Sequence, residues 1–109
     1  MNLELNYEGF EKYLVDRQYC ICPIGIHYVF KFDNGLGASV IKTKGCSHGY
    51  SDDLWELAII QWCNSREYHL VYMNEIIRDD NYNDGVYGYL TDEEVRNILN
   101  KIKKLKVTL

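Results

Sequence analysis

Long apolar runs, a basic excess and a secretory leader are all absent from this sequence, and each absence argues against one class of protein. No apolar stretch approaches the roughly 20 residues that span a bilayer, so we expect no membrane segment. The formal net charge is −4, whereas non-specific nucleic-acid binding needs an excess of Lys and Arg to replace counterions on phosphates. The first residues lack a basic flank, an apolar segment and a small-residue cleavage site, so we expect a cytoplasmic protein.

Nucleotide-binding and calcium-binding motifs are also absent. Neither G-x-G-x-x-G nor G-x-x-x-x-G-K-S/T occurs, so we expect no phosphate cradle. The acidic stretch 79–85 lacks the ligand spacing and the terminal Glu of an EF-hand, and its Asn, Asp and Gly residues are typical of a solvated turn. The four cysteines of a chain that is not exported are expected to be reduced thiols rather than two disulfides.

The composition is that of a folded domain with many tyrosines. A chain of 109 residues has room for one hydrophobic core, so residues 1–109 are predicted to form a single domain. Ten tyrosines raise the aromatic content to 14%. Tyrosine joins an apolar ring to a polar tip, so this excess favours half-buried strands and contact surfaces.

Hydrophobic periodicity predicts an α+β fold: an antiparallel β-meander of about four strands with a C-terminal amphipathic helix packed on one face. A short N-terminal helix is expected at about 7–17, and a long polar connection at 74–89. The capping box Thr91–Glu94 and an apolar stripe that continues to Leu105 predict the final helix. The expected strands are residues 26–32, 37–43, 54–62 and 68–72. In the first of them the alternation predicts one face with Ile26, Tyr28, Phe30 and Phe32 and an opposite face with His27 and Lys31.

Two short Cys and His motifs are the candidate metal or catalytic residues. Zinc prefers four N and S ligands, and such a set is supplied by Cys20, Cys22, Cys46 and His48. The alternative is that the first two cysteines are small buried hydrophobes. A further alternative makes Cys46 a nucleophile and His48 its base, oriented by Asp52 or Asp53. We expect no cofactor, with zinc as the competing prediction.

Tyrosines and acidic residues in the expected loops predict a protein-binding surface, because exposed aromatics mark binding sites. These acids are alternatively ordinary solubilising charges. The open edges of an antiparallel sheet also allow a homodimer. The predicted partner-binding residues are Tyr50, Asp52, Asp53, Asp79, Asp80, Tyr82, Asp84 and Tyr87, and Tyr89 is a further tyrosine expected in a loop.

Three segments resemble a group of small uncharacterised proteins of bacteriophages and prophages: FDNGLGASV at 32–40, LWELA at 54–58 and GYLTDEEV at 88–95. The resemblance covers roughly the last three-quarters of the chain and implies a phage origin, a bacterial host cell and a small α+β domain, with no activity to transfer. We therefore expect a non-enzymatic accessory protein that binds a host or phage protein, for example an anti-CRISPR-like inhibitor of bacterial defence. The alternatives are a small zinc-binding or Cys/His-dependent enzyme and a virion assembly component.

Overall fold

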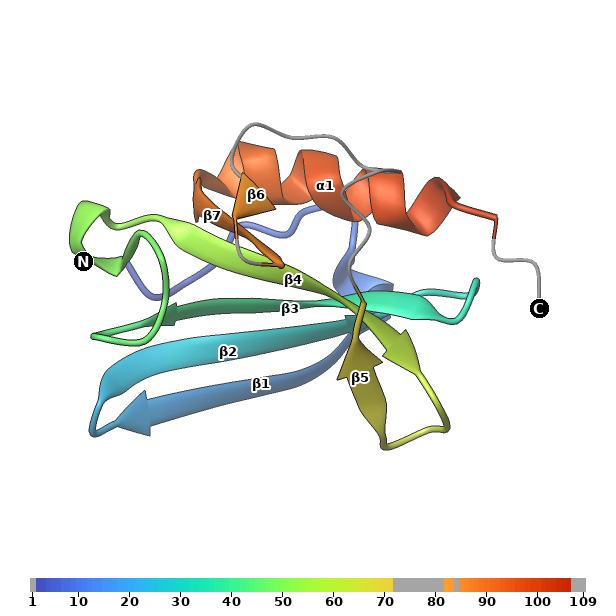
Figure 1. Ribbon diagram of the computed structural model, residues 1–109, viewed down its shortest axis with the longest axis horizontal. Coiled ribbons are helices and arrows are strands. Elements are labelled where there is room, and N and C mark those ends of the chain that lie inside the picture. The colour runs from blue at the N-terminus through green and yellow to red at the C-terminus, as the bar shows by residue number, and fades with distance from the viewer. Residues whose placement is uncertain (1, 72–81, 84, 107–109) are drawn as a thin grey trace.

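A computed structural model describes residues 2–71, 82, 83 and 85–106 of the chain. It contains one antiparallel sheet of seven strands with the α-helix α1 (Asp92–Lys104) on one face (Figure 1). The strand order is β1-β2-β3-β4-β7-β6, and β5 pairs with β4 beside this path. The strands are β1 (Leu14–Ile21), β2 (Ile24–Lys31), β3 (Leu36–Thr43), β4 (Trp55–Trp62), β5 (Tyr68–Leu70), β6 (Tyr82–Asn83) and β7 (Val86–Leu90).

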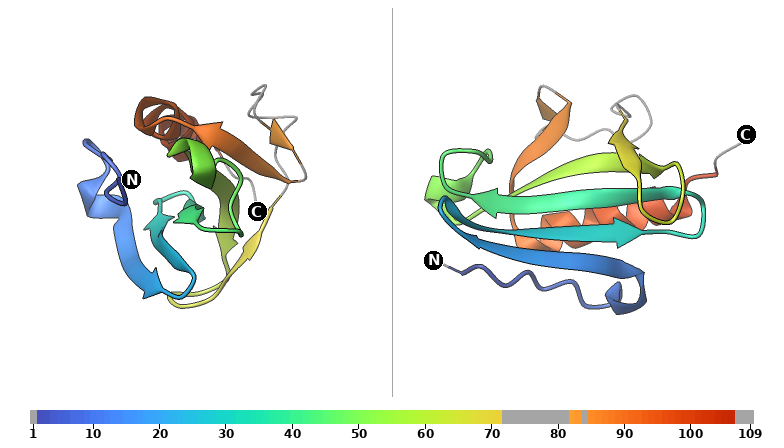
Figure 2. Two further views of the ribbon diagram at one scale, coloured as in Figure 1. Left: turned by 90° about the vertical axis from the view of Figure 1, so that its left-hand side faces the viewer. Right: turned by 90° about the horizontal axis from the view of Figure 1, so that it is seen from below.

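The hydrophobic core lies between α1 and the sheet face that α1 covers (Figures 1 and 2). In β2 the alternation predicted from the sequence is confirmed: Ile26, Tyr28 and Phe30 are at most 1% exposed and belong to this core. His27 and Lys31 occupy the alternate positions of the strand, on the opposite face of the sheet. Burial of each large apolar side chain contributes about 1.5–3 kcal/mol, so the core face fixes the register of the sheet.

Helix α1 begins where the sequence predicts. The Thr91 hydroxyl accepts a hydrogen bond from the Glu94 amide at 3.2 Å, and the Glu94 carboxylate accepts one from the Thr91 amide at 3.0 Å. This reciprocal pair confirms the predicted capping box. The apolar stripe is buried against the sheet through Val95, Ile98, Leu99 and Ile102. In the described residues no helix has both the length and the apolar content needed to cross a membrane.

The predicted N-terminal helix at 7–17 is wrong. A 3-10 turn (Glu11–Tyr13) is followed directly by β1, which pairs antiparallel with β2. The helical spacing of Tyr7 and Phe10 has a different cause, because both rings contact the core from an irregular segment. The pairing of β1 depends on hydrogen bonds to another part of the chain, which a local pattern does not reveal.

The expectation of four strands is too low, and the expected connection 74–89 is partly structured. It contains β6 and most of β7, and these strands form a hairpin in which Asn83 faces Val86. Strand β7 then continues the sheet next to β4. The described part of this segment is therefore a sheet element, whereas residues 74–81 and 84 lie outside the described residues.

Candidate functional site

One end of the sheet gathers half of the predicted site residues, and we call it the open end. It consists of the β1–β2 turn (residues 22–23), the β3–β4 connection (residues 44–54) and the end of β7 at residues 88–89. These segments adjoin one another, since the Lys44 amide donates to the Ile24 carbonyl at 2.9 Å and the Tyr89 amide donates to the His48 carbonyl at 3.3 Å. Figure 1 shows the β1–β2 turn, the β3–β4 connection and the start of α1 at the same side.

The β3–β4 connection is shaped by positive φ angles and by Glu56. Gly49 has φ +104° and Asp53 has φ +60°, and these residues flank a 3-10 turn (Tyr50–Asp52). The Glu56 carboxylate accepts a hydrogen bond from the His48 amide at 3.0 Å and lies 3.8 Å from His48 Nε2. Glu56 is only 12% exposed, so a largely buried carboxylate holds the His48 backbone and faces its ring.

Tyr89 lies beside this connection in an unusual backbone conformation. Its φ is +57°, a region that a bulky L-residue rarely adopts. The residue occupies an irregularity in the β4–β7 pairing, between the Trp55–Leu90 and Leu57–Tyr87 pairs, which turns its side chain outward to 54% exposure. Gly88 permits the close contact with the connection, because a Cβ at this position would lie 2.7 Å from the His48 Cβ.

A shallow pocket of about 270 Å³ opens between the connection and β7. The ring of Tyr89 lies 6.4 Å from the His48 ring, with 30° between the ring planes. Asp52 is exposed, and no ion pair to it occurs among the described residues. The pocket is lined by Gly45, Ser47, His48, Gly49, Tyr50, Ser51, Asp52 and Tyr89.

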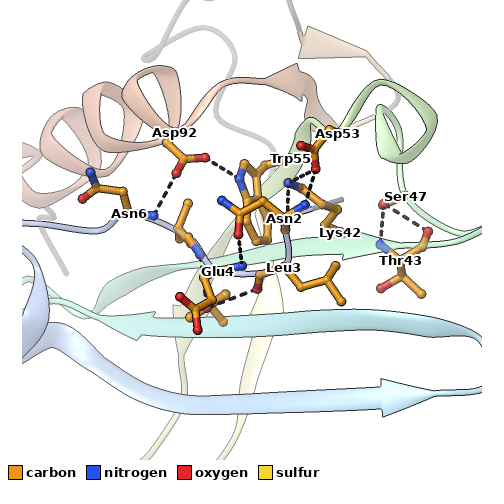
Figure 3. Close-up of polar contacts among 12 residues, drawn as sticks. Asn2, Leu3, Glu4, Asn6, Lys42, Thr43, Ser47, Asp53, Trp55 and Asp92 are labelled. Atoms are coloured by element: carbon orange, nitrogen blue, oxygen red, sulfur yellow. Dashed lines mark hydrogen bonds and ion pairs between the residues drawn. The ribbon is translucent and has the colours of Figure 1, made fainter.

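A buried lysine distinguishes Asp53 from its neighbour Asp52. Lys42 is 1% exposed, and its ammonium donates to Asp53 at 2.8 Å and to the Asn2 carbonyl at 2.7 Å (Figure 3). The ammonium also lies 4.2 Å from the centre of the Trp55 ring. The hydrogen bond from Lys42 holds the pKa of Asp53 below its ordinary value. Asp53 therefore fixes the N-terminal segment and Lys42, and only part of its carboxylate is available to a partner.

Three of the four predicted zinc ligands, Cys22, Cys46 and His48, lie at the open end, and Cys20 lies in β1 opposite Gly25. In the residues that the structure describes, which include all four, no group of three or more His, Cys, Asp or Glu side chains is placed to hold a metal ion. The alternative that Cys20 and Cys22 are buried hydrophobes is wrong, since both are exposed. The proposed orientation of His48 by Asp52 or Asp53 is also corrected, because Glu56 lies against its ring.

Apart from Asp53, which is bonded to Lys42, the predicted partner-binding residues divide into three groups. Tyr50 and Asp52 line the pocket described above. Tyr87 is 1% exposed in β7, and the Tyr82 ring meets its ring edge to face with centres 4.9 Å apart. The expectation that Tyr82, Tyr87 and Tyr89 lie in loops is wrong, because the first belongs to β6 and the other two belong to β7. The remaining predicted residues, Asp79, Asp80 and Asp84, lie outside the described residues.

Strand β1 forms an exposed edge of the sheet. The sequence predicted neither this strand nor its exposed edge. Within the described residues it pairs with β2 on one side only, and every residue after Leu14 is exposed. Tyr19 is 54% exposed and Ile21 is 80% exposed, although both face the same side of the sheet as the buried Ile26. The β1–β2 pairing is irregular at Val15 and Asp16. The side chains of Val15 and Asp16 line a second pocket together with Trp62 and Tyr68.

Two other polar pairs lie outside the predicted site. His27 Nε2 is 2.7 Å from Ser39 Oγ on the sheet face opposite α1, and burial lowers the pKa of His27. Cys63 Sγ is 3.2 Å from His69 Nδ1 in the exposed β4–β5 hairpin. Strand alternation placed His27 on this face, but the partners come from neighbouring strands whose register the sequence does not reveal.

No protein-family model, no curated protein and no solved structure matches this chain.

Proposed function

We propose that this protein is a non-enzymatic binding domain that captures an extended segment of a partner protein along β1. The observation that carries the proposal is the exposure of this edge strand. It is eight residues long, pairs on one side only within the part of the chain that the structure describes, and has Tyr19 and Ile21 at 54% and 80% exposure. An unpaired edge offers a row of backbone donors and acceptors to an incoming strand.

The last part of β1, residues 18–21, lacks the usual protection of an edge strand. Natural edge strands are protected by Lys, Pro, bulges or inward-pointing charges. In β1 the bulge lies at Val15 and Asp16 and the inward-pointing charge is Arg17, which donates to the Tyr28 hydroxyl, so both devices precede Gln18. An added strand would place alternate side chains against Tyr19 and Ile21 on the α1 side of the sheet. Its other side chains would face Val15 and Asp16, at the pocket closed by Trp62 and Tyr68.

In the fuller form of this proposal, the domain is a phage-encoded accessory protein that acts on a host or phage protein in the bacterial cytoplasm, with inhibition of a defence system as one such action. The overall charge of −4 supports a protein partner rather than non-specific binding to nucleic acid.

Selection of displayed 12-residue peptides on the immobilised protein tests strand addition. We expect selected peptides to alternate apolar and polar residues, and the double variant Tyr19→Lys/Ile21→Lys to weaken their binding at least tenfold. The control is Leu70→Lys, which adds a lysine at an aliphatic residue that is 49% exposed on β5 and does not line the pocket at Val15 and Asp16. Binding that is equally weakened by the control and by the β1 double variant, in proteins with unchanged melting curves, would contradict the proposal.

A second copy of the chain is the alternative occupant of β1. A symmetric antiparallel pair with Gln18 opposite Gln18 would place Arg17 opposite Tyr19 of the other copy on the same face, where a cation contacts an aromatic ring. Light scattering would then give twice the mass of one chain, and the β1 double variant would restore the monomer. A monomer at high concentration leaves the heterologous partner as the occupant.

A further inference from the structure

The pocket between Tyr89 and the β3–β4 connection has the composition of a site for a cation. Its lining contains one carboxylate that has no ion pair among the described residues, that of Asp52, and two phenol rings, those of Tyr50 and Tyr89. None of the described residues that line it is Lys or Arg. The nearby ammonium of Lys42 is engaged by Asp53 and by the Asn2 carbonyl. Asp52 is therefore the one Asp, Glu, Lys or Arg among the described residues that line the pocket, and the exposed Lys44, next to Gly45 in the sequence, is not part of this lining.

The aromatic rings add to this preference. The face of a tyrosine ring attracts a guanidinium or ammonium group within about 6 Å of its centre. Tyr89 is 54% exposed, so its ring is accessible from solvent, and the His48 ring lies 6.4 Å away at a tilt of 30°. A planar guanidinium can stack on such a ring and donate to a carboxylate at its edge.

The pocket is also held in shape before any ligand arrives. The His48 amide is bonded to the buried Glu56 carboxylate at 3.0 Å, and the Tyr89 amide is bonded to the His48 carbonyl at 3.3 Å. Gly88 allows these two elements to pack directly on one another, because a larger residue would meet the His48 Cβ. A preformed site loses less conformational entropy when it binds, which favours recognition of a single side chain.

We propose that this pocket binds the cationic side chain of an Arg or Lys residue presented by the partner protein. The inference rests on the proposed function in one respect, since the cation is taken to belong to a bound protein. The pocket and the β1–β2 turn lie at the same end of the sheet, so a partner paired with β1 can reach both. The partner segment is then expected to carry a basic residue beyond the stretch that pairs with the strand.

A titration with N-acetyl-arginine N-methylamide, followed by amide chemical shifts of the isotope-labelled protein, tests the pocket directly. We expect saturable shifts at Gly49, Asp52 and Tyr89, and no comparable shifts with the citrulline analogue, which has the same shape but no charge. Asp52→Asn and Tyr89→Leu should each weaken binding by about two- to fivefold, the range expected for one exposed ion pair or one exposed cation–π contact.

A control variant matches the carboxylate change elsewhere on the molecule. Asp33→Asn removes an exposed carboxylate from the opposite end of the sheet. It should leave the affinity for the arginine derivative unchanged. Equal binding of the citrulline derivative, shifts outside the pocket, or no binding at all would overturn the proposal and leave a solvated loop.

The two proposals fail independently in these experiments. Loss of the arginine response would remove the cation site, while the β1 variants would still report strand addition. Conversely, β1 variants without effect on peptide binding would remove strand addition, and a specific arginine response would still stand. Enrichment of Arg or Lys in the selected peptides would link strand addition to the cation pocket, provided that the enrichment disappears when the immobilised protein carries Asp52→Asn.

Discussion

At one end of the sheet the side chain of Asn34 is bonded within the fold, whereas at the open end several polar side chains face solvent. The bonded end contains the β2–β3 turn, residues 32–36, beside the C-terminus of α1. The Asn34 amide donates to the Ile102 and Leu105 carbonyls at 2.9 and 2.8 Å, and its oxygen accepts from the Leu36 amide at 3.0 Å. The turn thereby satisfies carbonyl groups that the end of a helix leaves without partners.

The connection at the open end uses its polar groups differently. Its one buried network, around Lys42 and Asp53, fastens the N-terminal segment, and Asp92 extends this fastening by accepting from the Asn6 amide and from the Trp55 indole (Figure 3). The adjoining residues Asp52 and Tyr89 are left exposed. The comparison teaches that the turn at the bonded end stabilises the fold through its contact with the helix. The connection at the open end instead leaves side chains exposed that a partner can contact.

The largest expected effect concerns the buried network at the open end. Asp53→Ala leaves the Lys42 ammonium buried without its carboxylate, which should lower the free energy of unfolding by about 2 kcal/mol. This value is below the range for fully buried pairs because the Asp53 side chain is 46% exposed, so water can reach the site. Urea unfolding measures the change.

Lys42→Met is the control for that prediction. It keeps an unbranched chain over Trp55 and leaves only a partly exposed carboxylate, which water can solvate. It should therefore cost less than Asp53→Ala. If Lys42→Met lowers the free energy of unfolding more than Asp53→Ala does, the hydrogen bonds of the ammonium contribute more to the stability of this end than its burial costs.

An intermediate effect is expected at the bonded end. Asn34→Ala removes the donor to the last carbonyls of α1 and the acceptor for the Leu36 amide, and should cost about 1–2 kcal/mol in unfolding free energy. Thermal melting measures this cost. Asn64→Ala, in the exposed β4–β5 turn, is the matched control and should cost less. Equal costs would show that the contact with the helix end adds nothing to an ordinary turn.

The smallest expected effect is a dependence of stability on pH from the sheet face opposite α1. Burial lowers the folded-state pKa of His27 below the unfolded value of about 6.5, so the unfolded chain binds more protons between these two values. Stability should therefore fall as the pH drops through and below that unfolded value. Urea midpoints from pH 8 to 5 measure this slope.

His27→Gln should flatten that slope, whereas His69→Gln, in the exposed β4–β5 hairpin, should keep it. An unchanged slope in His27→Gln would assign the pH dependence to another group. Neither variant alters the open end, so the response of the arginine probe should be the same in both.

The predictable parts of this fold are those coded by neighbouring residues. The alternation in β2 identified its buried face, and Thr91 and Glu94 located the start of α1. The alternation of β3 also places Lys42 on the same face as Val40, and that pattern was a signal for a buried lysine that composition alone hides. Clustering of the β1–β2 turn with the β3–β4 connection could not be predicted, because it follows from pairing between strands.

The sequence by itself determined the α+β class, the capped helix and the two faces of the central strands, since side-chain periodicity and capping act over a few residues. The tertiary structure decided that residues 14–21 form an edge strand and that Tyr87 is buried while Tyr89, two residues later, is exposed. It also decided that Asp53 pairs with the buried ammonium of Lys42, whereas Asp52 has no ion pair among the described residues. These outcomes depend on strand register and on contacts between distant segments, which only the packed sheet establishes.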